Sequence, residues 1–323
     1  MPSAASTAAR QVEFDPYVPL VAHPHVNTTL SRYWPLRLEA GEERRFSTEA
    51  GVTVVGRLHR HHPAGPLMLV VHGLEGSIDS NYMKWMTRAA LGAGFDVLRL
   101  NVRNCGGTDH LSPTLYHSGL TADLRAVVEQ LRERPLVLVG FSMSGNQALK
   151  LAGEWGALAP PHLAAVCAIS APIDLAACAR RIAEPQNRFY ERIFLKDLGA
   201  RVERKARLQP ERFSTEPLAQ VRTIIDFDHY ITAPAFGFRD AWDYYRQSSA
   251  APHLEAIRVP ALIIQAKDDP LIPFESFRQP ENPAVRLLAT DHGGHVGFVA
   301  RGRPRFWAAA QVVRFCGAVL SHP

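Results

Sequence analysis

The stretch GFSMSGN, at residues 140–146, contains a serine in a setting that suits nucleophilic catalysis. It follows an apolar run and precedes a helical pattern, so it can form the sharp strand-to-helix turn that lifts a serine hydroxyl above the edge of a sheet. The residues two positions before and after such a serine must be small, because strand and helix approach each other closely there. Gly140 meets this need, and Ser144 would fall in the first helical turn, where its Cβ is tolerated. We therefore predict that Ser142 is a nucleophile.

A second stretch, VVHGLEGS at residues 70–77, can supply the other half of an acyl-transfer site. It ends a predicted strand and opens a loop that contains two glycines. The loop can bring the backbone N–H of Leu74 towards the nucleophile, and Met143 supplies the N–H directly after Ser142. Two amides aimed at one point stabilise the oxyanion that develops during acyl transfer. The glycines would equally fit an ordinary strand–loop connection.

The acid and the base of a serine triad are expected later in the chain, in that order. A predicted strand ends at Asp268 and Asp269. A later strand end is followed by His292 and His295. We predict that Asp269 is the acid, because its spacing to Pro273 suits a loop that leaves the sheet edge; Asp268 is the alternative. His295 is the predicted base, since the two glycines before it leave room for the imidazole to reach the serine, whereas His292 is expected to be a loop residue.

Seven short apolar runs are typical of strands that are buried on both faces of a parallel sheet. They are residues 52–58, 67–73, 96–101, 136–141, 163–170, 261–266 and 284–289. Helical patterns lie between and after them, at residues 81–93, 119–133, 146–155 and 304–319. Alternation of strand and helix at this pitch predicts an α/β fold with a mostly parallel, doubly wound sheet.

The segment 175–254 breaks this alternation, since it has no convincing buried strand and its pattern is helical. We predict that it is an inserted helical cap on a core formed by residues 51–174 and 255–323, with residues 1–50 as an N-terminal extension packed on that core. Within the cap, residues 180–212 hold ten Lys or Arg and five Asp or Glu. Amphipathic helices with solvated faces would explain this charge. Attraction to an anionic surface or substrate headgroup, which salt would screen, is the alternative hypothesis.

Composition excludes several classes of function. The 323 residues are 46% hydrophobic with a net charge of +5, which is ordinary for a globular protein and unlike the strongly basic composition of nucleic-acid-binding proteins. No apolar run is long enough for a membrane span, and the first residues lack the core of a signal peptide. The four cysteines show no metal-ligand or redox spacing, which favours a reducing, cytoplasmic location. The histidines of HRHH (59–62) are more typical of an exposed turn than of a metal site, so we expect neither metal nor cofactor.

Several long motifs, in order, resemble the YheT-like (AB hydrolase-4-type) branch of the α/β-hydrolases. They are HPHVNTT (23–29), HGLEGSIDSNYMKWM (72–86), NVRNCGGTDHLSPTLYHSGLTADL (101–124), GFSMSGN (140–146), FDHYITAPAFGFRDAWDYYRQSS (227–249), AKDDPLIP (266–273) and HGGHVGF (292–298). The resemblance implies an α/β-hydrolase fold with a helical cap and a triad of Ser142, Asp269 and His295. Two positions depart from the family's usual glycines: Ser144, which bears on the geometry of the turn, and Asn104, which lies in a loop.

The resemblance also implies carboxylic-ester hydrolysis through an acyl-enzyme, on short- to medium-chain acyl esters or lipids. The alternatives are an alcohol acyltransferase with the same acyl-enzyme and a non-catalytic binding protein of this fold, against which the presence of all three triad candidates argues. The expected partner is a small-molecule acyl ester, with no nucleic acid and no membrane span; peripheral contact with anionic lipid through the basic cap is a further hypothesis. A cap over strand ends normally shapes an apolar pocket. The aromatic residues available to line it are Phe189, Tyr190, Phe194, Phe227, Phe236, Phe238 and Tyr244.

Overall fold

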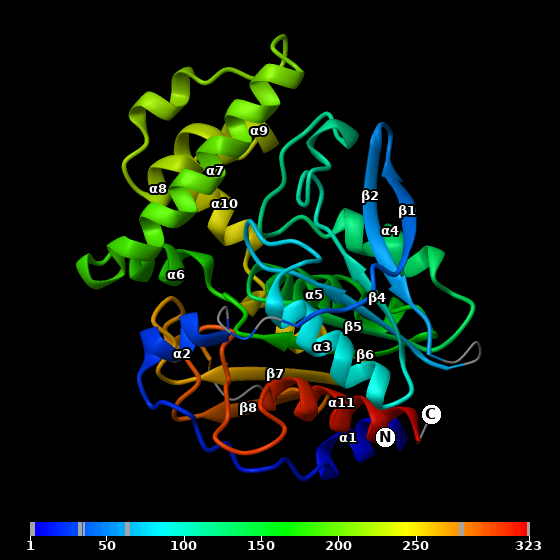
Figure 1. Ribbon diagram of the computed structural model, residues 1–323. Coiled ribbons are helices and arrows are strands. Elements are labelled where there is room, and N and C mark those ends of the chain that lie inside the picture. Colours follow the sequence, from blue (N-terminus) through cyan, green and yellow to red (C-terminus); the bar gives the residue numbers. More distant parts are fainter. Residues whose placement is uncertain (1–3, 32–33, 35, 62–64, 278–280, 322–323) are drawn as a thin grey trace.

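A computed structural model describes residues 4–31, 34, 36–61, 65–277 and 281–321 of the chain. Its centre is one eight-stranded sheet with helices packed on both faces, and a further group of helices lies above it (Figure 1). His62, the last histidine of HRHH, lies outside the described residues, as do short parts of the predicted N-terminal extension and core. The α/β architecture that the alternating strands and helices predict is confirmed.

The strands lie in the spatial order β1-β2-β4-β3-β5-β6-β7-β8. They are β1 (Glu42–Glu49), β2 (Val52–His59), β3 (Leu67–Val71), β4 (Asp96–Leu100), β5 (Leu136–Phe141), β6 (Leu163–Ile169), β7 (Ala261–Ala266) and β8 (Val285–Thr290). All neighbouring pairs from β4 to β8 are parallel, whereas β2 is antiparallel to both β1 and β4. The chain passes from β3 to β4 on one side and later returns to β5 on the other. Open α/β sheets bind ligands outside the carboxyl ends of the strands at such a reversal.

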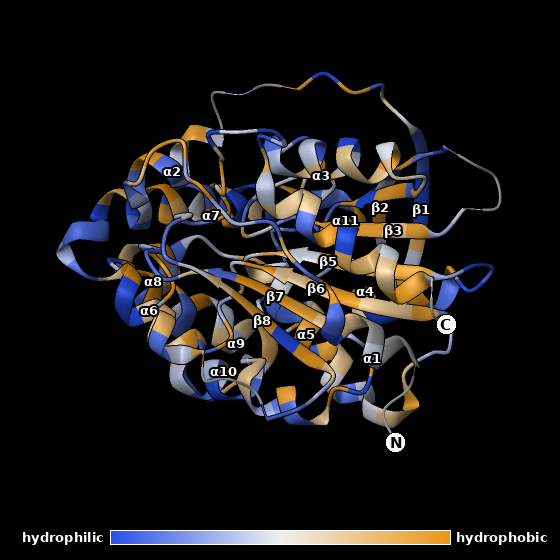
Figure 2. Ribbon diagram, turned by 90° about the horizontal axis from the view of Figure 1, so that it is seen from below, coloured by the Kyte–Doolittle hydropathy of each residue, from blue (hydrophilic) through white to orange (hydrophobic). Residues whose placement is uncertain are grey.

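Helices cover both faces of the sheet because its central strands are apolar on both sides; β3 and β5 are buried along their whole lengths. On one face pack α4 (Ala122–Gln130) and α5 (Met143–Trp155). On the other pack α3 (Asn81–Gly92) and α11 (Trp307–Leu320). Figure 2 shows the hydrophobic strands between these helix layers. This buried frame fixes where each strand ends, and therefore where the loops that follow the strands begin.

The predicted N-terminal extension, residues 1–50, includes a strand of the sheet. Residues 42–49 form β1 and so belong to the core. They pair antiparallel with β2, with Phe46 opposite Val54. The sequence EERRFSTE has no apolar pattern typical of a strand, because only Phe46 is buried and the other side chains are exposed or half-buried. Charged residues on an edge strand also discourage pairing with a second chain.

Residues 4–31 pack along the outside of the core. Helix α1 (Ala4–Gln11) lies beside α11 in Figure 1, and the Asp15 carbonyl accepts a hydrogen bond of 2.9 Å from Trp307 Nε1. Helix α2 (Pro24–Leu30) then lies against the loop after β8, where it contacts residues described below. The N-terminal segment therefore reaches the carboxyl edge of the sheet.

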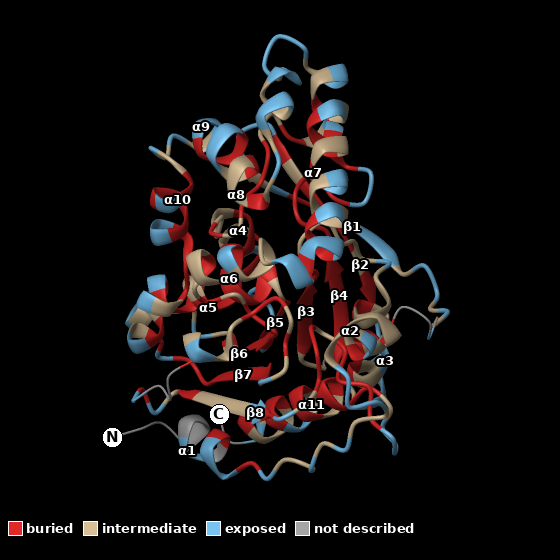
Figure 3. Cartoon of the chain, turned by 90° about the vertical axis from the view of Figure 1, so that its left-hand side faces the viewer, coloured by how far each residue is buried: buried red, intermediate tan, exposed pale blue. Residues whose placement is uncertain are grey.

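The helices of the predicted cap lie together beyond the carboxyl ends of the strands (Figure 1). They are α6 (Leu175–Ile182), α7 (Arg188–Leu208), α8 (Ile224–Phe227), α9 (Ala233–Phe236) and α10 (Ala241–Ser248). They share an apolar cluster of their own that includes Leu198, Phe227 and Tyr244. Figure 3 shows exposed residues along the outer side of α7. The boundaries 175 and 254 of a separate cap remain a prediction.

Candidate functional site

Ser142 lies at the turn between β5 and α5, in a backbone conformation that serine rarely adopts. Its φ is +49° and its ψ is −120°, in a region that costs energy for a residue with a side chain. The turn is held from both sides, because the Ser142 N–H donates to Ile169 O at 2.8 Å and the Ser142 carbonyl accepts from Gly145 N at 2.8 Å. A strained serine fixed in this way is the feature of a nucleophile turn.

The small residues on either side of Ser142 are accommodated in different ways. A Cβ on Gly140 would come within 2.6 Å of the backbone nitrogen of Gly145, so only glycine fits. Ser144 is fully buried in α5, which begins at Met143 and not at residue 146 as the pattern predicts. Its hydroxyl donates to the carbonyl of His72 at 2.5 Å. The buried hydroxyl of Ser144 therefore has a hydrogen-bond partner of its own.

Three side chains from separate loops form a continuous line of contacts. His295 Nε2 lies 2.9 Å from Ser142 Oγ, and His295 Nδ1 lies 2.9 Å from Asp269 Oδ2. With Nδ1–H donating to the carboxylate, Nε2 is left to accept the serine proton. The other Asp269 oxygen accepts from the amides of Leu271 at 2.9 Å and Ile272 at 3.2 Å, which fixes the carboxylate.

The two alternative residues of the sequence, Asp268 and His292, pair with each other instead. Asp268 Oδ2 lies 3.2 Å from His292 Nδ1, and Asp268 Oδ1 accepts from the Gly294 amide at 2.9 Å. These contacts tie the loop after β7 to the loop that carries His295. The structure thus brings Ser142 and His295 together with Asp269, and leaves Asp268 and His292 outside the line of contacts.

Helix α2 holds the His295 loop from the outside, a role that the sequence did not reveal. The His295 amide donates to Thr28 Oγ1 at 2.8 Å. A Cβ on Gly294 would lie 2.7 Å from that same oxygen, and one on Gly297 would lie 2.8 Å from the carbonyl carbon of Asn27. The glycines therefore let α2 approach closely. The only signal in the sequence was the motif HPHVNTT, and no pattern within it indicates what it contacts.

The two predicted oxyanion amides lie at the site. Met143 is the first residue of α5, where an N–H has no acceptor within the helix, and Leu74 N–H has no hydrogen-bond partner in the described part of the chain. Both residues line one cavity together with Ser142. A Cβ on Gly73 would lie only 3.0 Å from the Ser142 Cβ, so the loop passes very close to the serine and a larger residue would crowd it.

The neighbouring His72 anchors this loop from below. Its Nδ1–H donates to the Gly73 carbonyl at 2.7 Å, and its Nε2 accepts from the Val102 amide at 3.1 Å. Burial is the main cause that lowers the pKa of His72 to about 4, so the ring is neutral at physiological pH and matches this donor–acceptor pattern.

An arginine from the helices above the sheet fastens the other side of the same loop. Arg201 of α7 binds both carboxylate oxygens of Glu75, at 2.8 and 2.7 Å, and Asp109 Oδ1 at 3.0 Å. It also donates to the carbonyl of Asn104, a residue with a φ of +65°. Asparagine tolerates such angles better than most residues, which explains how it can stand at this position. Tyr116 completes the group through a 2.5 Å bond to Glu75.

Replacing Arg201 with methionine is expected to lower the free energy of unfolding by about 3–5 kcal/mol, because two nearly buried carboxylates lose their shared cation. Urea denaturation measures the change. Arg192→Met, on an exposed position of the same helix, should shift it by less than about 0.5 kcal/mol. Adding Glu75→Gln to Arg201→Met should restore part of the loss; a double variant less stable than the single one would refute the explanation.

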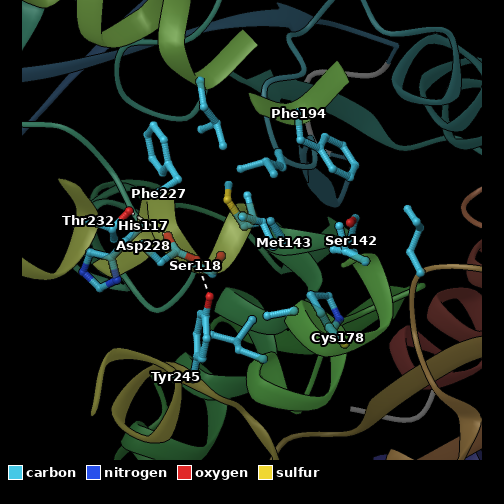
Figure 4. Close-up of a pocket in the computed structure, with 18 of the residues that line it drawn as sticks. His117, Ser118, Ser142, Met143, Cys178, Phe194, Phe227, Asp228, Thr232 and Tyr245 are labelled. Atoms are coloured by element: carbon cyan, nitrogen blue, oxygen red, sulfur yellow. Dashed lines mark hydrogen bonds between the residues drawn. The ribbon is translucent and has the colours of Figure 1, made fainter. Parts of the chain in front are cut away.

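A cavity opens from Ser142 towards the helices above the sheet (Figure 4). Its wall is mainly apolar and includes Leu175, Ile182, Leu198, Ile224, Leu271 and Ile272. Of the aromatic residues predicted to line it, Phe194, Phe227 and Tyr244 do so. Phe236 and Phe238 instead pack against the ring of His117, with centroids 4.5 and 5.4 Å away.

A second cavity meets the first at Ser142 and His295. Phe189 and Tyr190, predicted to line an acyl pocket, lie here instead. Its other lining residues include several hydroxyl and amide groups, among them Thr28, Thr29, Ser31, Ser80, Asn81 and Tyr82. Ser142 therefore lies where two cavities meet, and the wall of the second carries these hydroxyl and amide groups.

One carboxyl group, Asp228, lies in the wall of the apolar cavity. Burial raises the pKa of Asp228 from 3.8 to about 6, against the lowering effect of hydrogen bonds from Thr232 and Tyr245. The folded state therefore holds this proton at pH values where the unfolded chain has released it. The contribution of Asp228 to stability falls as pH rises from about 4 to about 6.

The Asp228→Asn variant should lack this pH dependence. The free energy of unfolding of the variant minus that of the wild type should increase by roughly 3 kcal/mol between pH 4 and pH 7. This follows because folding raises the pKa of Asp228 in the wild type by about two units. Denaturant titrations of both proteins at a series of pH values measure the difference. If the difference in unfolding free energy between the two proteins did not change with pH, the raised pKa of Asp228 would be contradicted.

The basic segment 180–212 is only partly available to an outside partner. Arg201 and Lys205 are buried, and Lys205 donates to the carbonyl of Asp109 at 3.1 Å. The exposed cations are Arg180, Arg188, Arg192, Lys196, Arg207 and Arg212. In the described residues, no group of three or more His, Cys, Asp or Glu side chains could hold a metal ion. None of the helices described is both long and apolar enough to cross a membrane.

The sequence is similar to that of several known proteins. The chain matches the family described as alpha/beta hydrolase fold over residues 66–301. It is 37% identical over 257 residues to the putative esterase YheT of Escherichia coli (strain K12), which covers 76% of this chain and 75% of that protein. It is 30% identical to the monoacylglycerol lipase of Saccharomyces cerevisiae and to phospholipase ABHD3 of Mus musculus, over 78% and 74% of this chain. The matched regions span 59% and 60% of those two relatives.

Solved structures share the architecture. The esterase Pf2001 of Pyrococcus furiosus superposes with a TM-score of 0.58 at 18% sequence identity, covering 94% of this chain and 98% of that one. At this identity the likeness concerns the fold alone.

Proposed function

Because the chain belongs to the α/β-hydrolase family, and within it to the branch that contains YheT, we propose that it is a serine carboxylic-ester hydrolase. The observation that carries the proposal is the line of contacts from Ser142 Oγ through His295 to Asp269, with both distances at 2.9 Å. These lengths suit proton transfer without rearrangement of the side chains. Relatives named as an esterase, a lipase and a phospholipase support the same class of reaction.

In the proposed mechanism, His295 Nε2 takes the proton of Ser142 as the serine oxygen attacks the ester carbonyl. Asp269 holds the imidazole in the required tautomer and stabilises its charged form. The amides of Leu74 and Met143 bind the oxyanion of the tetrahedral intermediate. The protonated imidazole then donates its proton to the departing alcohol, which leaves an acyl-enzyme on Ser142. Water, deprotonated by the same histidine, attacks this ester and releases the acid.

The two cavities support an assignment of the two halves of the substrate. The apolar cavity suits an acyl chain of short to medium length, since a hydrocarbon gains free energy as it leaves water. The cavity rich in hydroxyl groups suits the alcohol and the attacking water. An ester with an apolar acyl group and a polar alcohol fits both.

A panel of p-nitrophenyl esters from C2 to C16 tests this function. The proposal predicts a maximum of kcat/KM at short or medium chains, because the apolar wall of the cavity contacts only a limited length of acyl chain. The product should be the free acid, and analysis with and without added ethanol separates hydrolysis from acyl transfer. No p-nitrophenol above the uncatalysed rate with any ester, or equal rates across the series, would count against the proposal.

The exposed cations of the segment 180–212 support peripheral binding to anionic lipid as part of the same proposal. Binding to vesicles that contain phosphatidylserine should weaken as salt rises, because screening shortens the reach of surface charges. Co-sedimentation at low and high salt measures it, with neutral phosphatidylcholine vesicles as the control. Equal binding to both kinds of vesicle would contradict an electrostatic contact.

A further inference from the structure

The apolar cavity has a polar end. In Figure 4, Asp228, Thr232 and His117 lie at the side of the cavity opposite Ser142. Asp228 and Thr232 belong to a π-helical turn, Asp228–Thr232, between α8 and α9. Such turns are rare and occur frequently at functional sites. A cavity that served only to bind hydrocarbon would not require an ionisable group in its wall.

The protein satisfies the Asp228 carboxylate only in part. Its Oδ1 accepts from Thr232 Oγ1 at 2.7 Å, and its Oδ2 accepts from the Tyr245 hydroxyl at 2.7 Å. Each carboxylate oxygen can accept two hydrogen bonds, so each retains capacity for another donor. In the described part of the chain, no cation forms an ion pair with Asp228. The carboxylate thus faces the cavity with unused acceptors and without a counter-charge.

His117 adds an unused donor to the same wall. The Gly119 amide donates to His117 Nδ1 at 3.2 Å, so the proton of the neutral ring is on Nε2. Burial above all lowers the pKa of His117 to about 3, which keeps the ring neutral. The residue is 9% exposed, and Nε2–H has no acceptor among the described residues. Tyr244 packs on His117, with ring centroids 5.6 Å apart, and its pKa is raised by burial and, to a lesser extent, by Asp228.

We propose that the far end of this cavity binds a hydroxyl group carried by the acyl chain, with the Asp228 carboxylate as its acceptor and His117 Nε2–H as a donor on the same wall. The preferred substrates would then be esters of hydroxylated fatty acids. This inference rests on the proposed ester hydrolysis and narrows its substrate class. Asp228 and His117 would set specificity and would not take part in the chemical step.

The energetics favour a hydroxyl over a plain methyl end. A hydrocarbon end that fills the cavity excludes water from the carboxylate and offers no hydrogen bond, so the desolvation of Asp228 is not offset. A hydroxyl replaces that water with a charge-assisted bond and can also accept from His117. An ammonium group would satisfy the charge but not the imidazole N–H, which needs an acceptor. The combination of donor and acceptor therefore points to a neutral hydroxyl.

Matched ester series test the inference on the wild-type protein. The probes are p-nitrophenyl alkanoates from C4 to C12 with a methyl, hydroxyl or amino group at the chain end. At one or two chain lengths the hydroxy ester should exceed the methyl ester by about 10- to 100-fold in kcat/KM, the effect of one hydrogen bond to a charged group. No preference for the hydroxy ester at any length would overturn the inference, and so would a preference for the amino ester.

Variants of Asp228 and Tyr245 then test whether the preference for the hydroxy ester depends on the Asp228 carboxylate. In Asp228→Leu the ratio between hydroxy and methyl ester should fall to about one. Tyr245→Phe is the matched control: it removes a donor to Asp228 but leaves the carboxylate, so the preference should persist. If circular dichroism shows that Asp228→Leu does not fold, Asp228→Asn replaces it, with a several-fold fall in the ratio as the expected result. An unchanged ratio in the folded variant would refute the role of Asp228.

A binding measurement separates this inference from the proposed function. Calorimetric titration of the Ser142→Ala protein with ω-hydroxy and plain fatty acids from C6 to C12 needs no turnover. Tighter binding of the hydroxy acid at one chain length supports the polar end even if no ester is hydrolysed, in which case only the proposed reaction fails. Equal binding of the two acids at every length, together with ester turnover, overturns the inference and leaves the hydrolase intact.

Discussion

Replacing Ser142 with alanine should lower kcat for a short-chain p-nitrophenyl ester by roughly 10⁵-fold or more, because no acyl-enzyme can form. The oxyanion amides and the cavities would remain, so a small rate above that of water should persist. Stopped assays with the wild type at low concentration and the variant at high concentration cover this range. The fall should appear in kcat, with KM little changed, since the hydroxyl contributes little to ground-state binding.

Ser144→Ala is the matched control for this variant. Ser144 is a buried serine two residues further on whose hydroxyl bonds to the His72 carbonyl, so its loss should destabilise the protein by about 1–3 kcal/mol but leave the nucleophile in place. Ser142→Ala should show the opposite pattern, with stability nearly unchanged. An Ser142→Ala protein that retains more than a few per cent of wild-type kcat would contradict the assignment of the nucleophile.

Asp269→Asn is expected to lower kcat by roughly 10⁴-fold, although the substitution barely changes the size of the side chain. An amide can donate to His295 Nδ1, which moves the imidazole proton to Nε2. The nitrogen 2.9 Å from Ser142 Oγ would then no longer accept the serine proton. The variant should label slowly with a fluorophosphonate, because the serine is present but not activated.

The neighbouring Asp268→Asn gives a control of the same chemistry one residue away. Asp268 binds His292 and the Gly294 amide but not His295, and an asparagine oxygen can still accept from that amide. Its effect on kcat should stay within about tenfold. If Asp268→Asn lost as much activity as Asp269→Asn, the acid could not be assigned to Asp269 on the basis of the observed contacts.

The loops of the candidate site were predictable because their constraints are local. Gly140 is required two residues before Ser142 by a contact within the same turn, and that requirement is visible as spacing. The order of serine, acid and histidine follows from the order of the strands. The glycines before His295 indicated a tight loop, and the structure shows that His295 does reach the serine.

Features that depend on contacts between distant segments were not predictable. The support of His295 by Thr28 joins residues 267 positions apart, and nothing in either segment indicates the other. Strand β1 was missed because its charged residues suit an edge strand, where only Phe46 needs to be buried. The position of Asp228 was equally hidden, because an aspartate in a helical stretch is ordinarily exposed and only the packing of α8–α10 brings it to the cavity.

The central claim is that the hydroxyl of Ser142 becomes covalently acylated during turnover. Mass spectrometry of the intact protein after treatment with a fluorophosphonate, followed by peptide mapping, tests it most directly. We predict one adduct per chain, located on the peptide that contains Ser142 and lost in the Ser142→Ala variant. An adduct on another residue, or ester turnover by a protein that the reagent leaves unmodified, would contradict the mechanism.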